Sequence, residues 1–237
     1  MNRYLTSTSI LNFIERKFGY GFNELELNPD DILSTIRMET LPTYSKYFPY
    51  IIDHLINPLE DKVPNYENRY YLKVEDYTVL GVAEVFLSNT YYGDIVGLGY
   101  SAAVTNNGTE AQMVQDILSA NRVPVTHKYY AEDESVAVYP GGLMNKSVLC
   151  RIKVVHPDDF STIPLNMRDE FLKLCLYDVQ EAIYPLRRRF ANLQTAFGNI
   201  ELFVDDLAEA SSKKEELFER WRRNIIKAPN RKKLYIY

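Results

Sequence analysis

The segment 147–155, SVLCRIKVV, has the clearest periodic pattern in the chain. Its apolar side chains fall on alternate positions, Val148, Cys150, Ile152 and Val154, and its charged side chains, Arg151 and Lys153, fall between them. Successive side chains of a β-strand point to opposite faces, so this pattern predicts a strand with one buried face. The segment therefore predicts a β-rich region around it.

The neighbouring sequence adds further strands on both sides. Alternation at residues 70–74, a run over 79–87 and a run over 135–139 each predict a strand. Gly141-Gly142 favours a hairpin-like connection into 147–155. Residues 109–120 predict a short amphipathic helix, and 91–108 predict a Gly- and Asn-rich loop. Residues 69–157 are thus expected to form a mainly antiparallel β-rich region with an inserted helix.

The preceding residues, 1–68, are expected to be helical. Ser7 or Ser9 is a candidate cap for a first helix, and Asn28-Pro29 followed by two aspartates predicts the start of a second. Pro42 and Pro49 are expected to break the following helix, since proline lacks the backbone N–H.

The C-terminal region, 158–237, returns to helical periodicity. Apolar residues from Phe171 to Ile183 form a broad stripe, which Pro185 is expected to kink or end. A turn or extended element over 195–202 and a long helix over about 204–226 follow. The expected fold is α+β, with helical regions at both ends flanking an antiparallel β region; the three regions could form one composite domain.

The last seven residues combine a basic cluster with strand-like alternation. They are Arg231, Lys232, Lys233, Leu234, Tyr235, Ile236 and Tyr237. A strand leaves backbone donors and acceptors unpaired unless another strand accepts it, so we expect this tail to dock. The acceptor could lie in the same subunit or in a neighbouring one. Residues 213–233 carry nine Lys/Arg against three Glu, on a chain of net charge −5, which suits contact between copies or with an acidic partner.

The composition is that of a folded globular protein. The 19 Tyr fit either an interface rich in aromatic side chains or an AT-rich genome. Cys150 and Cys175 lie in apolar contexts and predict buried thiols. The chain shows no apolar stretch of membrane-spanning length and no signal-peptide core, so we expect synthesis in a cytoplasm and no membrane contact.

None of the patterns that resemble a catalytic or cofactor site is convincing. Gly97–Ala102 fits a loose dinucleotide pattern without the required strand and helix. His156–Asp159 is better explained as a strand end and turn than as a metal site. Glu215-Glu216 is expected on a solvated helix face. We expect no catalytic residues, cofactor, metal or small-molecule substrate, although a site assembled from distant residues stays an alternative.

Two arginine clusters are candidates for contact with DNA or an acidic protein. They are Arg187, Arg188 and Arg189, and Arg220, Arg222 and Arg223. Arginine binds phosphates and carboxylates bidentately, but cations near the C-terminus of a helix also interact favourably with the helix dipole. Both explanations stay open at this point.

The C-terminal region resembles virion structural proteins of tailed bacteriophages, of the neck or head–tail connector type. The resemblance rests on segments 163–168, 178–179, 184–187, 197–202 and 230–237, and residues 57–72 show a weaker similarity. It implies a non-enzymatic subunit of a ring beneath the portal, made in an infected bacterium, whose C-terminal extension contacts portal or tail proteins and which could transiently contact packaged DNA. The β-rich middle departs from small helical adaptors and leaves open a tail-completion or baseplate role, or less readily a nucleic-acid-binding protein or enzyme.

Overall fold

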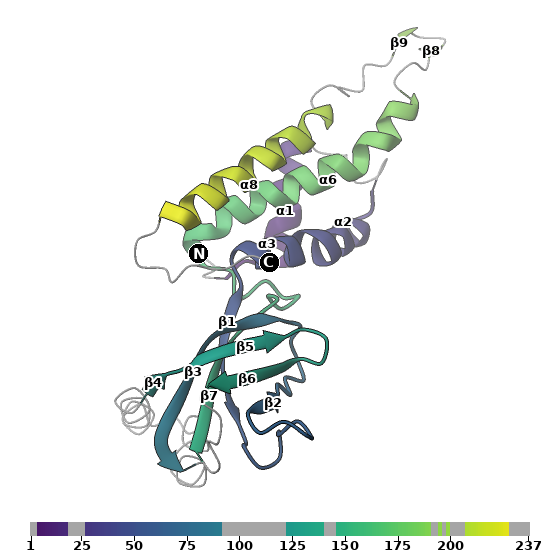
Figure 1. The fold of residues 1–237 in the computed structure, drawn as a ribbon. Helices are drawn as coiled ribbons and strands as arrows, with labels where there is room; N and C mark the ends of the chain where they lie inside the picture. Colours follow the sequence, from purple (N-terminus) through teal and green to yellow (C-terminus); the bar gives the residue numbers. More distant parts are fainter. Residues whose placement is uncertain are drawn as a thin grey trace. The chain divides into compact units, whose positions relative to one another are not determined.

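The computed structural model describes residues 4–18, 27–91, 122–139, 146–190, 194–195, 198–199 and 207–227. Contacts divide the chain into two units, residues 1–48 with 156–237, and residues 49–155. Helices flank antiparallel sheets along the sequence, so the fold is α+β as expected (Figure 1). None of the described helices is long and apolar enough to cross a membrane.

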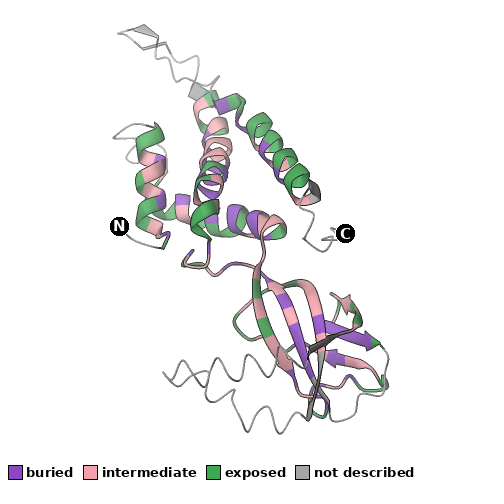
Figure 2. Ribbon diagram, turned by 90° about the vertical axis from the view of Figure 1, so that its left-hand side faces the viewer, coloured by how far each residue is buried: buried purple, intermediate pink, exposed green. Residues whose placement is uncertain are grey.

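The helical unit is built around α6 (Arg168–Phe190), which follows the short helix η5 (Leu165–Met167). Helices α1 (Ser7–Phe18), α2 (Pro29–Thr35) and α8 (Ala210–Lys227) all contact α6. Buried positions along α6 include Phe171, Leu174, Cys175, Val179 and Ile183, which confirms most of the predicted apolar stripe. Figure 2 shows that α8 is buried on one side and exposed on the other.

Two helix boundaries differ from the sequence expectation. Thr6, rather than Ser7 or Ser9, caps α1, because Thr6 and Ser9 exchange side-chain to backbone hydrogen bonds of 3.3 and 3.0 Å. Pro185 lies inside α6, and the helix continues to Phe190.

Pro42 does not break the second helical segment. A π-helical turn, η2 (Ile36–Thr40), connects α2 to α3 (Leu41–Tyr47), and the N–H of Leu41 bonds to the carbonyl of Ile36. A π turn widens the helix locally, and Pro42 follows at the start of α3, where no intrahelical N–H is needed. The helix ends before Pro49, as expected.

The β unit contains two antiparallel sheets. One has the order β1-β7-β3-β4 and the other β2-β6-β5. The strands of the first are β1 (Tyr50–Ile56), β7 (Lys146–Val154), β3 (Val79–Tyr91) and β4 (Arg122–Pro124). Those of the second are β2 (Arg69–Tyr71), β6 (Ser135–Tyr139) and β5 (Thr126–Tyr130).

Residues from both sheets form one core. It contains Val148, Cys150, Ile152 and Val154 of β7, each with no exposed surface, together with Val136 and Val138 of β6. Residues 147–154 therefore lie in the central strand β7, which is paired on both sides, and the predicted buried face of this strand is confirmed.

The boundary between helices and strands is earlier in the structure than in the sequence analysis. Residues 50–56, assigned there to the helical N-terminal region, form β1 and pair with β7 from Tyr50↔Val154 to Ile56↔Val148. The predicted hairpin-like connection between β6 and β7 is wrong. β6 pairs with β2 and β5, whereas β7 pairs with β1 and β3.

A short two-stranded element, β8 (Gln194–Thr195) with β9 (Gly198–Asn199), lies where an extended or turn element was expected. The expected helix at 109–120, the dinucleotide-like pattern at 97–102 and most of the loop over 91–108 lie outside the described residues, as does the C-terminal tail.

Candidate interaction surfaces

An aromatic cluster fixes α8 against the rest of the helical unit. Trp221 of α8 is 2% exposed, and its ring lies 5.1 Å from Phe48, 5.4 Å from Tyr47 and 5.9 Å from Tyr44. The indole Nε1 also donates a hydrogen bond of 3.1 Å to Glu170 of α6. Edge-to-face aromatic pairs add about 0.5–1.5 kcal/mol each beyond the area that they bury. Trp221 therefore holds α8 on α3 and α6.

A buried ionic network makes a second connection between the same helices. Asp178 of α6 is 2% exposed, and it accepts a hydrogen bond of 2.5 Å from the hydroxyl of Thr40. Lys214 of α8 lies 2.7 Å from both Asp178 Oδ1 and Glu181 Oε2. A buried carboxylate is stable only when it is paired and hydrogen-bonded, so this network specifies how η2, α6 and α8 pack.

The same contacts set the charge of Lys214. Burial lowers the pKa of this ammonium group, but hydrogen bonds to Asp178 and Glu181 raise it, and the net pKa lies above the usual value for lysine. Lys214 therefore stays charged at neutral pH. Asp178 was not predicted as a site; the available signal was a carboxylate within the apolar stripe of α6.

A basic groove runs along the exposed side of α6 and α8. Its volume is about 630 Å³, and its lining includes four cations, Lys173, Lys213, Arg220 and Arg223. Each cation has a carboxylate of the same unit within salt-bridge distance: Glu170 pairs with Lys173 and Arg220, Glu209 with Lys213, and Glu219 with Arg223. The groove thus presents ordered cations whose charge is largely compensated.

The structure separates the two arginine clusters. Helices α6 and α8 are antiparallel, because Arg220 pairs with Glu170 near the start of α6 whereas Lys214 pairs with Glu181 further along it. The residues 187–189 occupy the last turn of α6. With a rise of 1.5 Å per residue, about 25 Å of helix separates them from Glu170. The six arginines therefore form no single patch.

Individual arginines of the clusters have different surroundings. Arg222 lies outside the groove lining and contacts Glu215 at 3.1 Å and the Tyr47 hydroxyl at 3.2 Å. Arg188 lies over the ring of Tyr184, 5.9 Å from its centroid. Residues 231–237, the predicted partner-binding tail, lie outside the described part of the chain.

The segment that resembled a metal site has a structural explanation. His156 is 4% exposed; its Nε2 donates to the carbonyl of Phe48 at 2.8 Å, so its Nδ1 accepts from the Thr162 hydroxyl at 2.6 Å. Burial lowers the pKa of His156, which favours the neutral ring. Asp159 accepts hydrogen bonds from Ser161 in the following turn. No group of three or more metal-ligating side chains occurs among the described residues.

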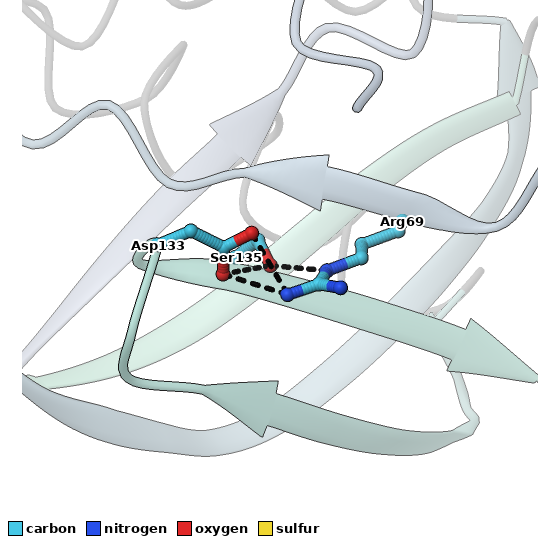
Figure 3. A network of polar contacts seen from close by, with 3 residues as sticks. All are labelled: Arg69, Asp133 and Ser135. Atoms are coloured by element: carbon cyan, nitrogen blue, oxygen red, sulfur yellow. Dashed lines mark hydrogen bonds and ion pairs between the residues drawn. The ribbon is translucent and has the colours of Figure 1, made fainter. Parts of the chain in front are cut away.

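A polar network in the β unit is the other feature that the sequence analysis missed. Arg69 of β2 pairs with both oxygens of Asp133 at 2.8 Å, and its Nε donates to Ser135 at 2.6 Å (Figure 3). The guanidinium also lies 3.9 Å from the ring centroid of Tyr130 and 5.0 Å from that of Tyr66. The network ties the β5–β6 turn to β2, and its internal pairing indicates a structural role.

Both cysteines are buried, as expected. Burial raises the pKa of Cys150 to about 12, and burial raises that of Cys175 as well. Nucleophilic cysteine chemistry requires an accessible thiolate, which neither environment favours.

Comparison with known proteins gives one informative match. The chain matches the bacteriophage ring protein family over residues 4–237. A chain in a solved structure, the neck of an empty GTA particle computed with C6 symmetry, is 15% identical, with 92% of this chain and 93% of that chain covered and a TM-score of 0.27. A similarity this low supports no conclusion about the fold or the role of this chain. No curated protein matches the sequence. The family match spans nearly the whole sequence, and the chain therefore belongs to the bacteriophage ring protein family.

Proposed function

We propose that this protein is a non-enzymatic structural subunit of a phage virion, which forms a ring at the neck and contacts neighbouring proteins through residues 231–237. The proposal that the protein forms a ring rests on the family match over residues 4–237. The position at the neck is supported by the resemblance of the C-terminal sequence to head–tail connector proteins.

The helical unit supports the role of the tail. Along the sequence, α8 ends at Lys227 and the tail begins at Arg231. Trp221 and Lys214 fix α8 through independent contacts, an aromatic cluster and a buried ion pair. Backbone hydrogen bonds would order the tail on a partner, and its apolar residues would fill alternate pockets.

The arginine clusters take a secondary part in this proposal. The groove cations are already paired with carboxylates, so a mixed or acidic protein surface suits them better than a nucleic acid backbone. Surface ion pairs of this type contribute little to stability.

Purified virions test the position and the ring. Quantitative mass spectrometry should find the protein in virions at a fixed copy number per portal, and antibody labelling should locate it at the neck. Absence from virions would overturn the proposal, and labelling at the distal end of the tail would favour the baseplate alternative.

A truncated protein that ends at Pro229 tests the tail. We expect it to keep the helical circular dichroism of the full chain but to lose ring formation or capture of neck proteins. The matched variants are replacement of Leu234 and Ile236 by Ser and replacement of Arg231 to Lys233 by Gln. The first should abolish capture, and the second should slow association and reduce its salt dependence. Unchanged assembly of the truncated protein would refute docking through the tail.

A further inference from the structure

Strand β1 is an edge of the four-stranded sheet. Within the described ranges it pairs with β7 alone, and the sheet order places no strand beyond it. An edge strand presents a row of backbone donors and acceptors, which is a template for pairing with another strand. Natural sheets usually protect such edges with short strands, lysine, proline or a bulge.

The other sheet edges carry more of these protections than β1 does. β4 has three residues and ends in Pro124, β2 has three residues and begins with Arg69, and β5 contains Lys128. β1 has seven residues, YIIDHLI, without proline, lysine or arginine, and its pairing to β7 is continuous without a bulge. Its one carboxylate, Asp53, lies 3.1 Å from Arg151 of β7. β1 is thus the longest edge among the described strands.

The surface beside β1 has room for additional side chains. Tyr50, Ile51, Ile52, Asp53 and Arg151 line an open depression of about 540 Å³. Ile51 is 51% exposed, so part of its aliphatic side chain is accessible on this face. An added strand would cover Ile51 and extend the sheet.

We propose that β1 is the acceptor for the C-terminal tail, residues 231–237, of a neighbouring copy. This inference rests on the proposed ring function and adds its acceptor. The tail is the one segment of the chain whose sequence both alternates apolar residues and begins with a cationic cluster. Added as a fifth strand, it would exchange backbone hydrogen bonds with β1 and place side chains from alternate positions beside Ile51.

Charge complementarity supports this pairing. Residues 49–155, the β unit, contain 13 Asp/Glu and 8 Lys/Arg, a net charge of −5, which equals the net charge of the whole chain. Residues 231–233 contribute three positive charges. An acidic β unit would therefore attract the tail before the strand pairs.

Ring geometry explains why the acceptor would belong to another copy. A ring of more than two identical subunits requires two different complementary surfaces on each subunit. The tail and the β1 edge are two such surfaces, present once in every copy. Such head-to-tail contacts form a ring when the rotation between neighbours closes, and a closed ring holds weak contacts together through avidity.

Disulfide trapping between two full-length variants tests this proposal. One variant carries Ile51→Cys and the other Leu234→Cys; both native cysteines are buried, so they should not compete. The two are mixed under assembly conditions and oxidised, and we expect a disulfide-linked pair with one copy of each. The control partner is Met38→Cys, which is 76% exposed and lies in the helical unit. The Leu234→Cys variant should cross-link at least about tenfold faster to Ile51→Cys than to Met38→Cys, because strand pairing raises the effective concentration of the tail cysteine beside Ile51→Cys.

The remaining outcomes separate the hypotheses. Equal cross-linking rates for Ile51→Cys and Met38→Cys would overturn β1 as the acceptor. If the same variants still assembled into rings, the proposed function would stand without this acceptor. A double variant, Ile51→Cys with Leu234→Cys, that closes within a single chain would assign the tail to its own subunit and overturn the exchange between copies. As a second measurement, Ile51→Lys should reduce assembly at least about tenfold with unchanged circular dichroism; unchanged assembly would contradict the proposal.

Discussion

Replacing Lys214 by Met should destabilise the helical unit strongly at neutral pH. The substitution keeps most of the aliphatic stem but removes the ammonium group 2.7 Å from Asp178, whose side chain is 1% exposed. The Thr40 hydroxyl remains as a hydrogen-bond donor to the buried carboxylate. An uncompensated buried charge is costly, so the packing of α6 and α8 should lose stability.

Removing one partner of a buried ion pair costs about 3–5 kcal/mol, because the other charge stays buried without compensation. Lys214 is 23% exposed, so water can replace part of the lost interaction. We expect a loss of about 2–4 kcal/mol in the free energy of unfolding at pH 7.

Urea unfolding followed by tryptophan fluorescence measures this loss. Trp221 is the single tryptophan of the chain and lies on α8, so it reports on the helical unit. Lys213→Met is the matched control, because Lys213 is the adjacent residue but pairs at the surface with Glu209. The control should show no measurable change.

A loss below about 1 kcal/mol for Lys214→Met at pH 7 would show that the buried pair does not hold α8. Adding Asp178→Asn to Lys214→Met should restore part of the stability, since the amide needs no counter-charge.

Three further predictions concern other buried groups. Trp221→Ala should destabilise the helical unit by about 3–5 kcal/mol, measured by loss of helical circular dichroism in urea, and a loss below about 1 kcal/mol would contradict its anchoring role. Burial lowers the pKa of both His54 and His156, so on acidification the unfolded state should bind protons before the folded state does. Stability should therefore fall as the pH drops below about 6.5. His156→Gln should reduce this pH dependence for the helical unit, and an equal pH dependence in the variant would contradict the role given to His156. Cys150 and Cys175 should react with a thiol reagent only after unfolding, and rapid labelling of the native protein would contradict their burial.

Local periodicity was sufficient to place the main helices and several strands. The alternation in 147–155 identified β7 and its buried face, and the apolar stripe of α6 was confirmed at Phe171, Leu174 and Val179. Pro42 misled the analysis, because proline excludes an intrahelical N–H but not a helix that restarts after a π turn. β1 was missed because its seven residues follow a helix and carry only partial alternation.

The interaction surfaces were less accessible to sequence reasoning. The arginines could be identified as cations, but nothing local showed that α6 and α8 are antiparallel, which places the two clusters at opposite ends. The carboxylate partners of Arg220 and Lys214 lie 50 and 33 residues away. Asp178 is a charged residue among the apolar residues of α6, and this pattern was the local indication of a buried ion pair.

Periodicity and composition were enough to assign the type of most elements, many of the residues that face the core and the chemistry of the tail. These properties depend on periods of 2 and 3.6 residues and on residue content, which a single chain displays directly. Only the folded chain shows which strands pair, that β1 is an edge strand, and that Asp178 meets Thr40, 138 residues away, and Lys214. Partner choice between distant segments depends on how whole elements pack, and no local pattern encodes it.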